Sequence, residues 1–285
     1  MSEILFGQRG QQVHIQGPLM AQSLVDKQVL HSTATEKEWD ILPYVNVIGI
    51  GGRSIMDRGR KAVLPLAEEI VRNRGKHMMI LGVSGGTRTR HVYAIALDLG
   101  IPTGGLARIA GASEEQNQKM LLAILAKDGG VQLAQDHFWD LPDKLAGDMI
   151  PIMIAMPPYH YWEQPPYDGR LPMNGSDLGF YVFAETLGVR SLIYVKDQDG
   201  LYTADPTVDR QAEFISQISV QELRRRAYPD LIVEPMVLET MLKARHVKRI
   251  QIINGLKPGN LTAALNGEAA GTIIYVEDNR AIAEA

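Results

Sequence analysis

The sequence predicts a three-layer α/β/α fold, in which helices cover both faces of a central, mainly parallel β-sheet. Two observations lead to this prediction: short apolar, β-branched runs recur along the chain from Val45 onward, and helical patterns lie between most of them. Strands that alternate with helices in this way form parallel sheets covered on both faces. The chain of 285 residues is long enough for one large domain of this kind or for two small ones.

Each predicted strand is a short apolar run, which suits a strand that is buried on both faces. These runs cover residues 45–50, 78–83, 131–134, 150–155, 191–195, 249–253 and 272–276. We therefore expect a sheet of about seven or eight strands.

Helical patterns predict helices over residues 61–74, 89–99, 113–127, 177–187 and 235–244. Two helix starts carry an additional signal, because Ser113 with Gln116 and Ser219 with Glu222 have the spacing of a capping box. We expect a helix to begin at each of these serines.

The domain organisation follows from where this alternation begins. Residues 1–40 show no clear period and are predicted to be an N-terminal extension, and residues 41–285 to form a single domain. Residues 156–176 also lack a period and contain five prolines. This segment is too long for an ordinary connection, and such loops are often functional.

Composition excludes several classes of function. A formal net charge of −4 argues against a large nucleic-acid interface. The chain has no cysteine, which excludes disulfides and thiolate chemistry. The N-terminus lacks a secretory signal pattern, and the longest apolar run, over 149–158, is too short to span a bilayer. We expect a cytoplasmic protein with neither a nucleic-acid nor a membrane partner.

Glycine pairs follow two of the predicted strands. Gly51 and Gly52 end the first strand, and Gly85 and Gly86 follow the second. Glycines there let backbone N–H groups approach a phosphate, and ligands in α/β sheets lie beyond the carboxyl ends of the strands. Arg53 and Arg88 could add positive charge. The alternative is two tight turns with solvated arginines.

Three further groups are candidates for binding. The run VKDQDGLYTADP over 195–206 contains two turn signals, and by spacing alone it is only a loop with two turns. His160 lies among aromatic residues in the proline-rich segment, where it could bind a metal or an oxyanion or simply pack. Asp177 lies near a helix start, where capping is the simpler interpretation.

Together these motifs resemble the amino acid kinase superfamily, and within it the molybdenum storage protein family. The run DGLYTADP over 199–206 is similar to the nucleotide-binding loop of uridylate kinases. The likeness to the storage branch covers about residues 40–276 and is carried by IGGRSIMDRG (50–59), GGTRTRHVYAIALDLGIPTG (85–104), MPPYHYW (156–162), VKDQDGLYTADP (195–206) and ARHVKRIQIINGLKPGNLTAALNGEAAGTII (244–274).

This resemblance implies a subunit of a hexameric cage that binds ATP with Mg²⁺ and holds molybdate or tungstate as polyoxometalate clusters. The cage would be a homo-oligomer or a hetero-oligomer with a paralogous subunit; the chain shares features with both subunit types of the family. The implied nucleotide-binding residues are Gly51, Gly52, Arg53, Gly85, Gly86, Arg88, Asp177, Lys196, Asp199, Gly200, Tyr202 and Asp205, and the implied cluster ligand is His160.

One position departs from the superfamily pattern. The superfamily usually has a lysine two residues before the first glycine pair, and this chain has Gly49 there. Loss of that ammonium removes a fixed positive charge from the transferring phosphate, which is a main catalytic term in phosphoryl transfer. Gly49 and the long loop over 156–176 therefore favour storage, to which ATP hydrolysis could be coupled, over the alternative function of a small-molecule kinase that transfers phosphate from ATP to UMP.

Overall fold

The computed structural model describes residues 4–5, 14–15, 39–134, 138–156, 171–172 and 174–277. The chain divides into two compact units, Met1–Trp39 and Asp40–Ala285. In the first unit, β1 (Ile4–Leu5) pairs with β2 (His14–Ile15) in antiparallel orientation. The division into an extension over 1–40 and one domain over 41–285 stays a prediction.

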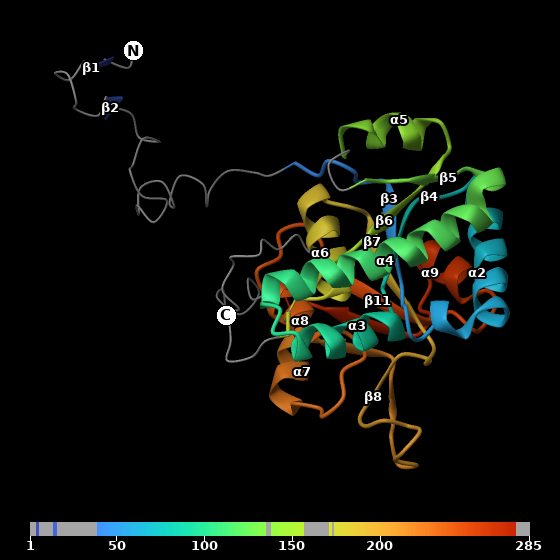
Figure 1. The fold of residues 1–285 in the computed structure, drawn as a ribbon. Helices are drawn as coiled ribbons and strands as arrows, with labels where there is room; N and C mark the ends of the chain where they lie inside the picture. Colours follow the sequence, from blue (N-terminus) through green and yellow to red (C-terminus); the bar gives the residue numbers. More distant parts are fainter. Residues whose placement is uncertain are drawn as a thin grey trace, which may run out of the picture. The chain divides into compact units, whose positions relative to one another are not determined.

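The second unit is built on an eight-stranded sheet with the strand order β10-β12-β11-β7-β3-β4-β6-β5 (Figure 1). Strands β11, β7, β3, β4, β6 and β5 run parallel, and only the pairing of β12 with β11 is antiparallel within this sheet. The strands are β3 (Val45–Ile50), β4 (Met78–Val83), β5 (Gly130–Gln132), β6 (Ile150–Ile154), β7 (Ser191–Lys196), β10 (Gln217–Ser219), β11 (Arg249–Asn254) and β12 (Thr272–Tyr275).

Helices cover both faces of this sheet, so the predicted α/β fold is confirmed. The helices are α2 (Arg60–Asn73), α3 (Thr87–Asp98), α4 (Thr103–Leu125), α5 (Leu141–Ala146), α6 (Ser176–Leu187), α7 (Val220–Arg226), α8 (Pro235–Met241) and α9 (Asn260–Leu265). Short 3₁₀ turns lie at η1 (Met56–Arg58), η2 (Ala126–Asp128) and η3 (Phe138–Asp140), and β8 (Leu201–Tyr202) pairs with β9 (Phe214–Ile215) in a small separate hairpin. None of the helices in the described part of the chain is both long and apolar enough to cross a membrane.

The core forms two apolar layers because successive residues of a strand point to opposite faces. Val47 of β3 packs in the layer that contains α6, α7 and α8, whereas Ile48 of the same strand packs in the layer that contains α2, α4 and α9. Each central strand is therefore apolar at nearly every position, which is the pattern seen in the sequence.

The predicted elements match the structure closely except at one helix start. The predicted helix start at Ser219 is confirmed, because its side chain caps α7 by accepting a hydrogen bond from the backbone N–H of Glu222 at 3.1 Å; the Glu222 carboxylate pairs with Arg225 and Arg226. The prediction that a helix begins at Ser113 is wrong, because α4 already begins at Thr103 and Ser113 is buried within it. Its hydroxyl donates to the carbonyl of Ile109, one turn earlier, so it bonds within the helix and caps nothing.

The height of α6 above the sheet is set by Phe180. Gly49 of β3 lies directly opposite Gly82 of β4, and the fully buried ring of Phe180 rests on both. A Cβ atom added at Gly49 would lie 2.6 Å from Cδ2 of Phe180, and one added at Gly82 would lie 2.0 Å from Cε1. Both glycines are therefore required by the close approach of the ring.

Gly49→Lys should destabilise the protein by about 3 kcal/mol or more, because the new side chain would displace Phe180 from a packed core. Gly75→Lys is the matched control: nothing lies within 4 Å of a Cβ at Gly75, so we expect a change within about 0.5 kcal/mol. Urea unfolding measures both. Equal free energies of unfolding for the two variants would contradict the claim that Phe180 sets the position of α6 on the sheet.

Candidate functional site

A cavity of about 590 Å³ lies at the carboxyl ends of the neighbouring strands β7, β3 and β4. Its wall includes residues that directly follow each of these strands: Gly51 after β3, Ser84 after β4 and Asp197 after β7. The start of α6 and the residues around Glu234 complete the wall. Parallel strands place their carboxyl ends on one edge, so three loops far apart in sequence share one cavity.

The two glycine loops pack tightly against each other. A Cβ atom at Gly52 would lie 2.3 Å from the backbone nitrogen of Gly86 and 2.6 Å from the carbonyl oxygen of Ser84. Gly86 has a φ of 73°, a conformation that favours glycine, and it directly precedes α3. The sequence therefore needs glycine at Gly52 and Gly86 for the close approach of two backbones on the cavity wall.

The turn η1 ties the first loop to the other two. Asp57 accepts a hydrogen bond from the backbone N–H of Thr87 at 2.7 Å, which caps the start of α3. The next residue, Arg58, forms an ion pair with Asp197 after β7. Two adjacent residues of the first loop thus hold both neighbouring loops in place.

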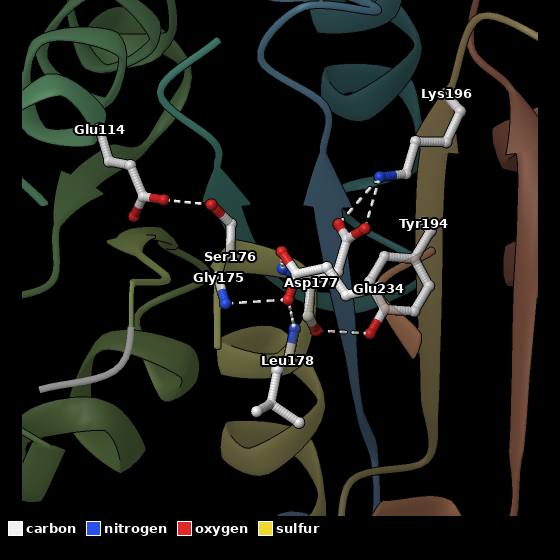
Figure 2. Close-up of polar contacts among 8 residues, drawn as sticks. All are labelled: Glu114, Gly175, Ser176, Asp177, Leu178, Tyr194, Lys196 and Glu234. Atoms are coloured by element: carbon white, nitrogen blue, oxygen red, sulfur yellow. Dashed lines mark hydrogen bonds and ion pairs between the residues drawn. The ribbon is translucent and has the colours of Figure 1, made fainter. Parts of the chain in front are cut away.

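Asp177 and Lys196, which both line the cavity, form an ion pair (Figure 2). The ammonium of Lys196, at the end of β7, contacts both carboxylate oxygens of Asp177, in the first turn of α6, at 2.8 and 2.9 Å. The buried hydroxyl of Tyr194 donates to the backbone carbonyl of Asp177 at 2.7 Å. These contacts fix a lysine ammonium beside the two glycine loops.

Two more carboxyl groups line the cavity, the buried Glu114 and the partly buried Glu234, and the sequence analysis did not find either. Glu114 of α4 accepts the backbone N–H groups of Ala155 and Met156 at 2.8 and 2.7 Å and the hydroxyl of Ser176. Burial raises the pKa of Glu114 to about 7, although these donors oppose the shift. Nothing in the local sequence around Glu114 distinguishes it from a surface residue.

Glu234 accepts backbone N–H groups from the first turn of α6, as Figure 2 shows. Burial, followed by the negative charge of Asp177, raises the pKa of Glu234 to about 6. Its position directly before Pro235, the first residue of a helix, was the only available signal, and that signal indicates a helix start and not a site.

The loop after β7 presents some of its predicted residues to the cavity and uses others as anchors. Tyr202 and Asp205 line the cavity. Asp199 instead accepts hydrogen bonds from Lys257 at 2.7 Å and Asn254 at 2.9 Å, which lower its pKa. Asp199 therefore holds the loop to the end of β11 and is not among the residues that form the cavity wall.

The structure brings most of the predicted nucleotide-binding residues together. Those on the cavity wall are Gly51, Gly52, Arg53, Gly85, Gly86, Asp177, Lys196, Gly200, Tyr202 and Asp205. Arg88 is not on this wall, because its guanidinium donates to the buried side chain of Asn117 on α4. His160 lies outside the described residues, so its predicted role stays a prediction.

The raised pKa of Glu114 predicts a pH-dependent stability. In the folded protein this carboxyl stays protonated up to about pH 7, against about 4.5 when unfolded. The protonated carboxyl therefore contributes fully to the free energy of unfolding below pH 4.5. About 3 kcal/mol of this contribution is lost as the pH rises to 7. The side chain of Glu114→Gln cannot ionise. Between pH 4.5 and 8, the free energy of unfolding of this variant, measured with urea, should therefore rise by this amount relative to that of the wild type. Parallel curves would contradict the assignment.

Comparison with known proteins agrees with this arrangement. The sequence profile of the amino acid kinase family matches residues 159–254. Uridylate kinase from Hyperthermus butylicus is 21% identical over 70% of this chain and 83% of that protein. The crystal structure of uridylate kinase from Archaeoglobus fulgidus, also 21% identical, superposes with a TM-score of 0.64 and covers 80% of this chain and 99% of that one, which shows the shared fold.

A much stronger similarity connects the chain to molybdenum storage. The molybdenum storage protein subunit beta of Azotobacter vinelandii is 43% identical over 256 residues, which cover 90% of this chain and 95% of that protein. Identity at this level over nearly the whole length of both chains shows common family membership. The chain belongs to the molybdenum storage protein family.

Proposed function

We propose that this chain is an ATP-binding subunit of a molybdenum storage assembly. The observation that carries the proposal is the position of Lys196, which Asp177 holds beside two glycine loops on one cavity wall. Glycine loops at strand ends can present backbone N–H groups to phosphates, and the ammonium of Lys196, although paired with Asp177, is held on the same wall as a hydrogen-bond donor. The similarity to a storage protein subunit gives the site its biological setting.

ATP would lie across the strand ends, with its phosphates at the glycine loops and near Arg53. Its base would lie toward the loop after β7, where Tyr202 offers an aromatic ring and Asp205 a carboxylate. The Asp205 carboxylate is held by the backbone N–H and the hydroxyl of Thr207, at 2.8 and 2.7 Å. This loop is therefore preorganised for a ligand.

A Mg²⁺ ion would enter with the nucleotide. The described residues contain no group of three or more His, Cys, Asp or Glu side chains placed to hold a metal ion. Mg²⁺ bound to a nucleotide needs only one or two carboxylates besides the phosphates and water. Asp177 and Asp197 lie on the cavity wall and fit this requirement, and the ion would neutralise phosphate charge next to them.

The packing around Gly49 argues against the kinase alternative. The space in which a lysine side chain would begin is filled by the ring of Phe180, so the superfamily ammonium cannot be supplied from this strand. Lys196, at the end of the neighbouring strand β7, is a cation on the cavity wall that could replace it, but its charge is already paired with Asp177. Efficient phosphate transfer to UMP is therefore not the function that this arrangement favours.

The stored cargo would be molybdate or tungstate, held as polyoxometalate clusters inside a closed hexamer in the cytoplasm. Closed symmetric assemblies are the usual way to enclose a volume. The similar storage protein is named as a subunit, which supports an assembly with a paralogous chain or with further copies of this one. His160 would contact a cluster, because an imidazole can donate to an oxyanion or ligate a metal.

Metal analysis tests the proposed function. The protein, purified from cells grown with molybdate and incubated with MgATP, should hold several molybdenum atoms per chain by mass spectrometry, and omission of MgATP should reduce this loading. A coupled assay with ATP and UMP should show no comparable turnover. Protein that phosphorylates UMP and holds no molybdenum or tungsten would overturn the proposal in favour of the kinase.

The same assay tests His160. His160→Ala should lower the molybdenum content without a change in MgATP affinity or in molecular mass by light scattering. His91→Ala, an exposed histidine on α3 that is not on the cavity wall, is the control and should store as much as the wild type. Full storage by His160→Ala would show that this histidine has no role in holding the cargo.

A further inference from the structure

The first turn of α6 is held by a residue from a distant part of the chain. The N-cap residue of this helix is Gly175, which has no side chain to cap the exposed N–H groups. Glu234, the residue before α8, supplies the missing acceptor. We propose that Glu234 is a positioning residue that holds the first turn of α6 so that Asp177 faces Lys196.

The contacts of Glu234 reach three backbone groups of this turn. One carboxylate oxygen, Oε2, accepts from the N–H of Gly175 at 3.0 Å and from that of Leu178 at 3.1 Å, and Oε1 accepts from the N–H of Asp177 at 3.3 Å. Because these donors lie on both sides of the Asp177 side chain, they fix the backbone from which that side chain leaves (Figure 2). The helix dipole favours a negative group in the same place.

Gly175 provides an independent sign of this contact. A Cβ atom at Gly175 would lie 2.2 Å from Oε1 of Glu234 and 3.0 Å from its Cδ. The φ of Gly175 is −111°, which any residue can adopt, so its backbone conformation does not require glycine. The carboxylate itself excludes a side chain at this position, and Gly175→Ala should displace Glu234 without any change in charge.

The position of Glu234 is electrostatically unfavourable without such a role. Its carboxylate lies beside that of Asp177 on the wall of a cavity that, under the proposed function, receives an anion. If Glu234 acted only through its charge, its neutralisation would strengthen MgATP binding. A positioning role predicts the opposite sign, because loss of the three backbone contacts would loosen Asp177 and with it the ammonium of Lys196.

Glu69 offers a matched control. It is a buried glutamate that, like Glu234, accepts from the first turn of another helix: the backbone N–H and the hydroxyl of Thr262 in α9 donate to it at 2.8 and 2.9 Å. Glu69 lies on α2 and is not on the cavity wall. Glu69→Gln should therefore reproduce the stability effect of losing such a contact with no effect on Lys196.

The test measures two properties of Glu234→Gln, Gly175→Ala and Glu69→Gln. The first is the rate at which the amine of Lys196 is acetylated in the protein without nucleotide, followed by mass spectrometry. It should rise about fivefold in the first two variants and stay unchanged in Glu69→Gln, because release from Asp177 exposes the amine. The second is the dissociation constant for MgATP by calorimetry, which should rise about tenfold in the same two variants only.

The outcomes separate this inference from the proposed function, on which its nucleotide part rests. Tighter or unchanged MgATP binding by Glu234→Gln, with unchanged acetylation of Lys196, would overturn the positioning role. If Glu234→Gln does not fold, the acetylation rate of Lys196 and the dissociation constant for MgATP in Gly175→Ala decide whether Glu234 has the positioning role. If the wild type does not bind MgATP, the proposed function fails, and the acetylation rates alone decide whether Glu234 positions Lys196.

Discussion

The contact of Phe180 with Gly49 and Gly82 is the constraint on which the site depends. It lets α6 approach two central strands of the sheet more closely than any other residue pair at these positions would allow. Asp177 lies three residues before Phe180 on the same helix, so the position of Phe180 also determines the position of Asp177. One packing contact in the core thus decides where the first turn of α6 meets Lys196.

Under the proposed function, this contact also explains how a fold shared with uridylate kinases can bind a nucleotide without efficient phosphate transfer. In a lysine-bearing first strand, the side chain would have to occupy the volume that the ring of Phe180 fills. The chain keeps the glycine loops and Lys196 but replaces the strand lysine by an aromatic core contact. Nucleotide binding and phosphate transfer depend on different groups, so the first can persist where the second is weakened.

The sheet was predictable from the sequence because buried parallel strands are apolar at nearly every position. The runs at Val45–Ile50 and Met78–Val83 have the observed bounds. The start of α4 was mistaken because Ser113 and Gln116 have the spacing of a capping box, whereas the helix begins at Thr103 and runs through both residues. The glycine loops and the run after β7 were likewise predictable, since close backbone approach leaves a glycine signature.

The rest of the site could not be predicted because its partners are distant in sequence. Glu114 and Glu234 acquire their roles only where α4, α6 and the start of α8 meet, and no local pattern distinguishes a buried carboxyl from a solvated one. Arg88 has the right position beside a glycine loop, but its direction is set by Asn117. Sequence patterns locate backbone features well and side-chain directions poorly.

The most direct test of the account is hydrogen–deuterium exchange with and without MgATP. The account predicts slower exchange in the glycine loops at 51–54 and 84–87, in the first turn of α6 and in the loop at 196–206, with no change in helix α5, which contributes no residue to the cavity wall. Protection that is absent from these segments, or that appears elsewhere on the chain, would contradict the claim that this cavity is a nucleotide site.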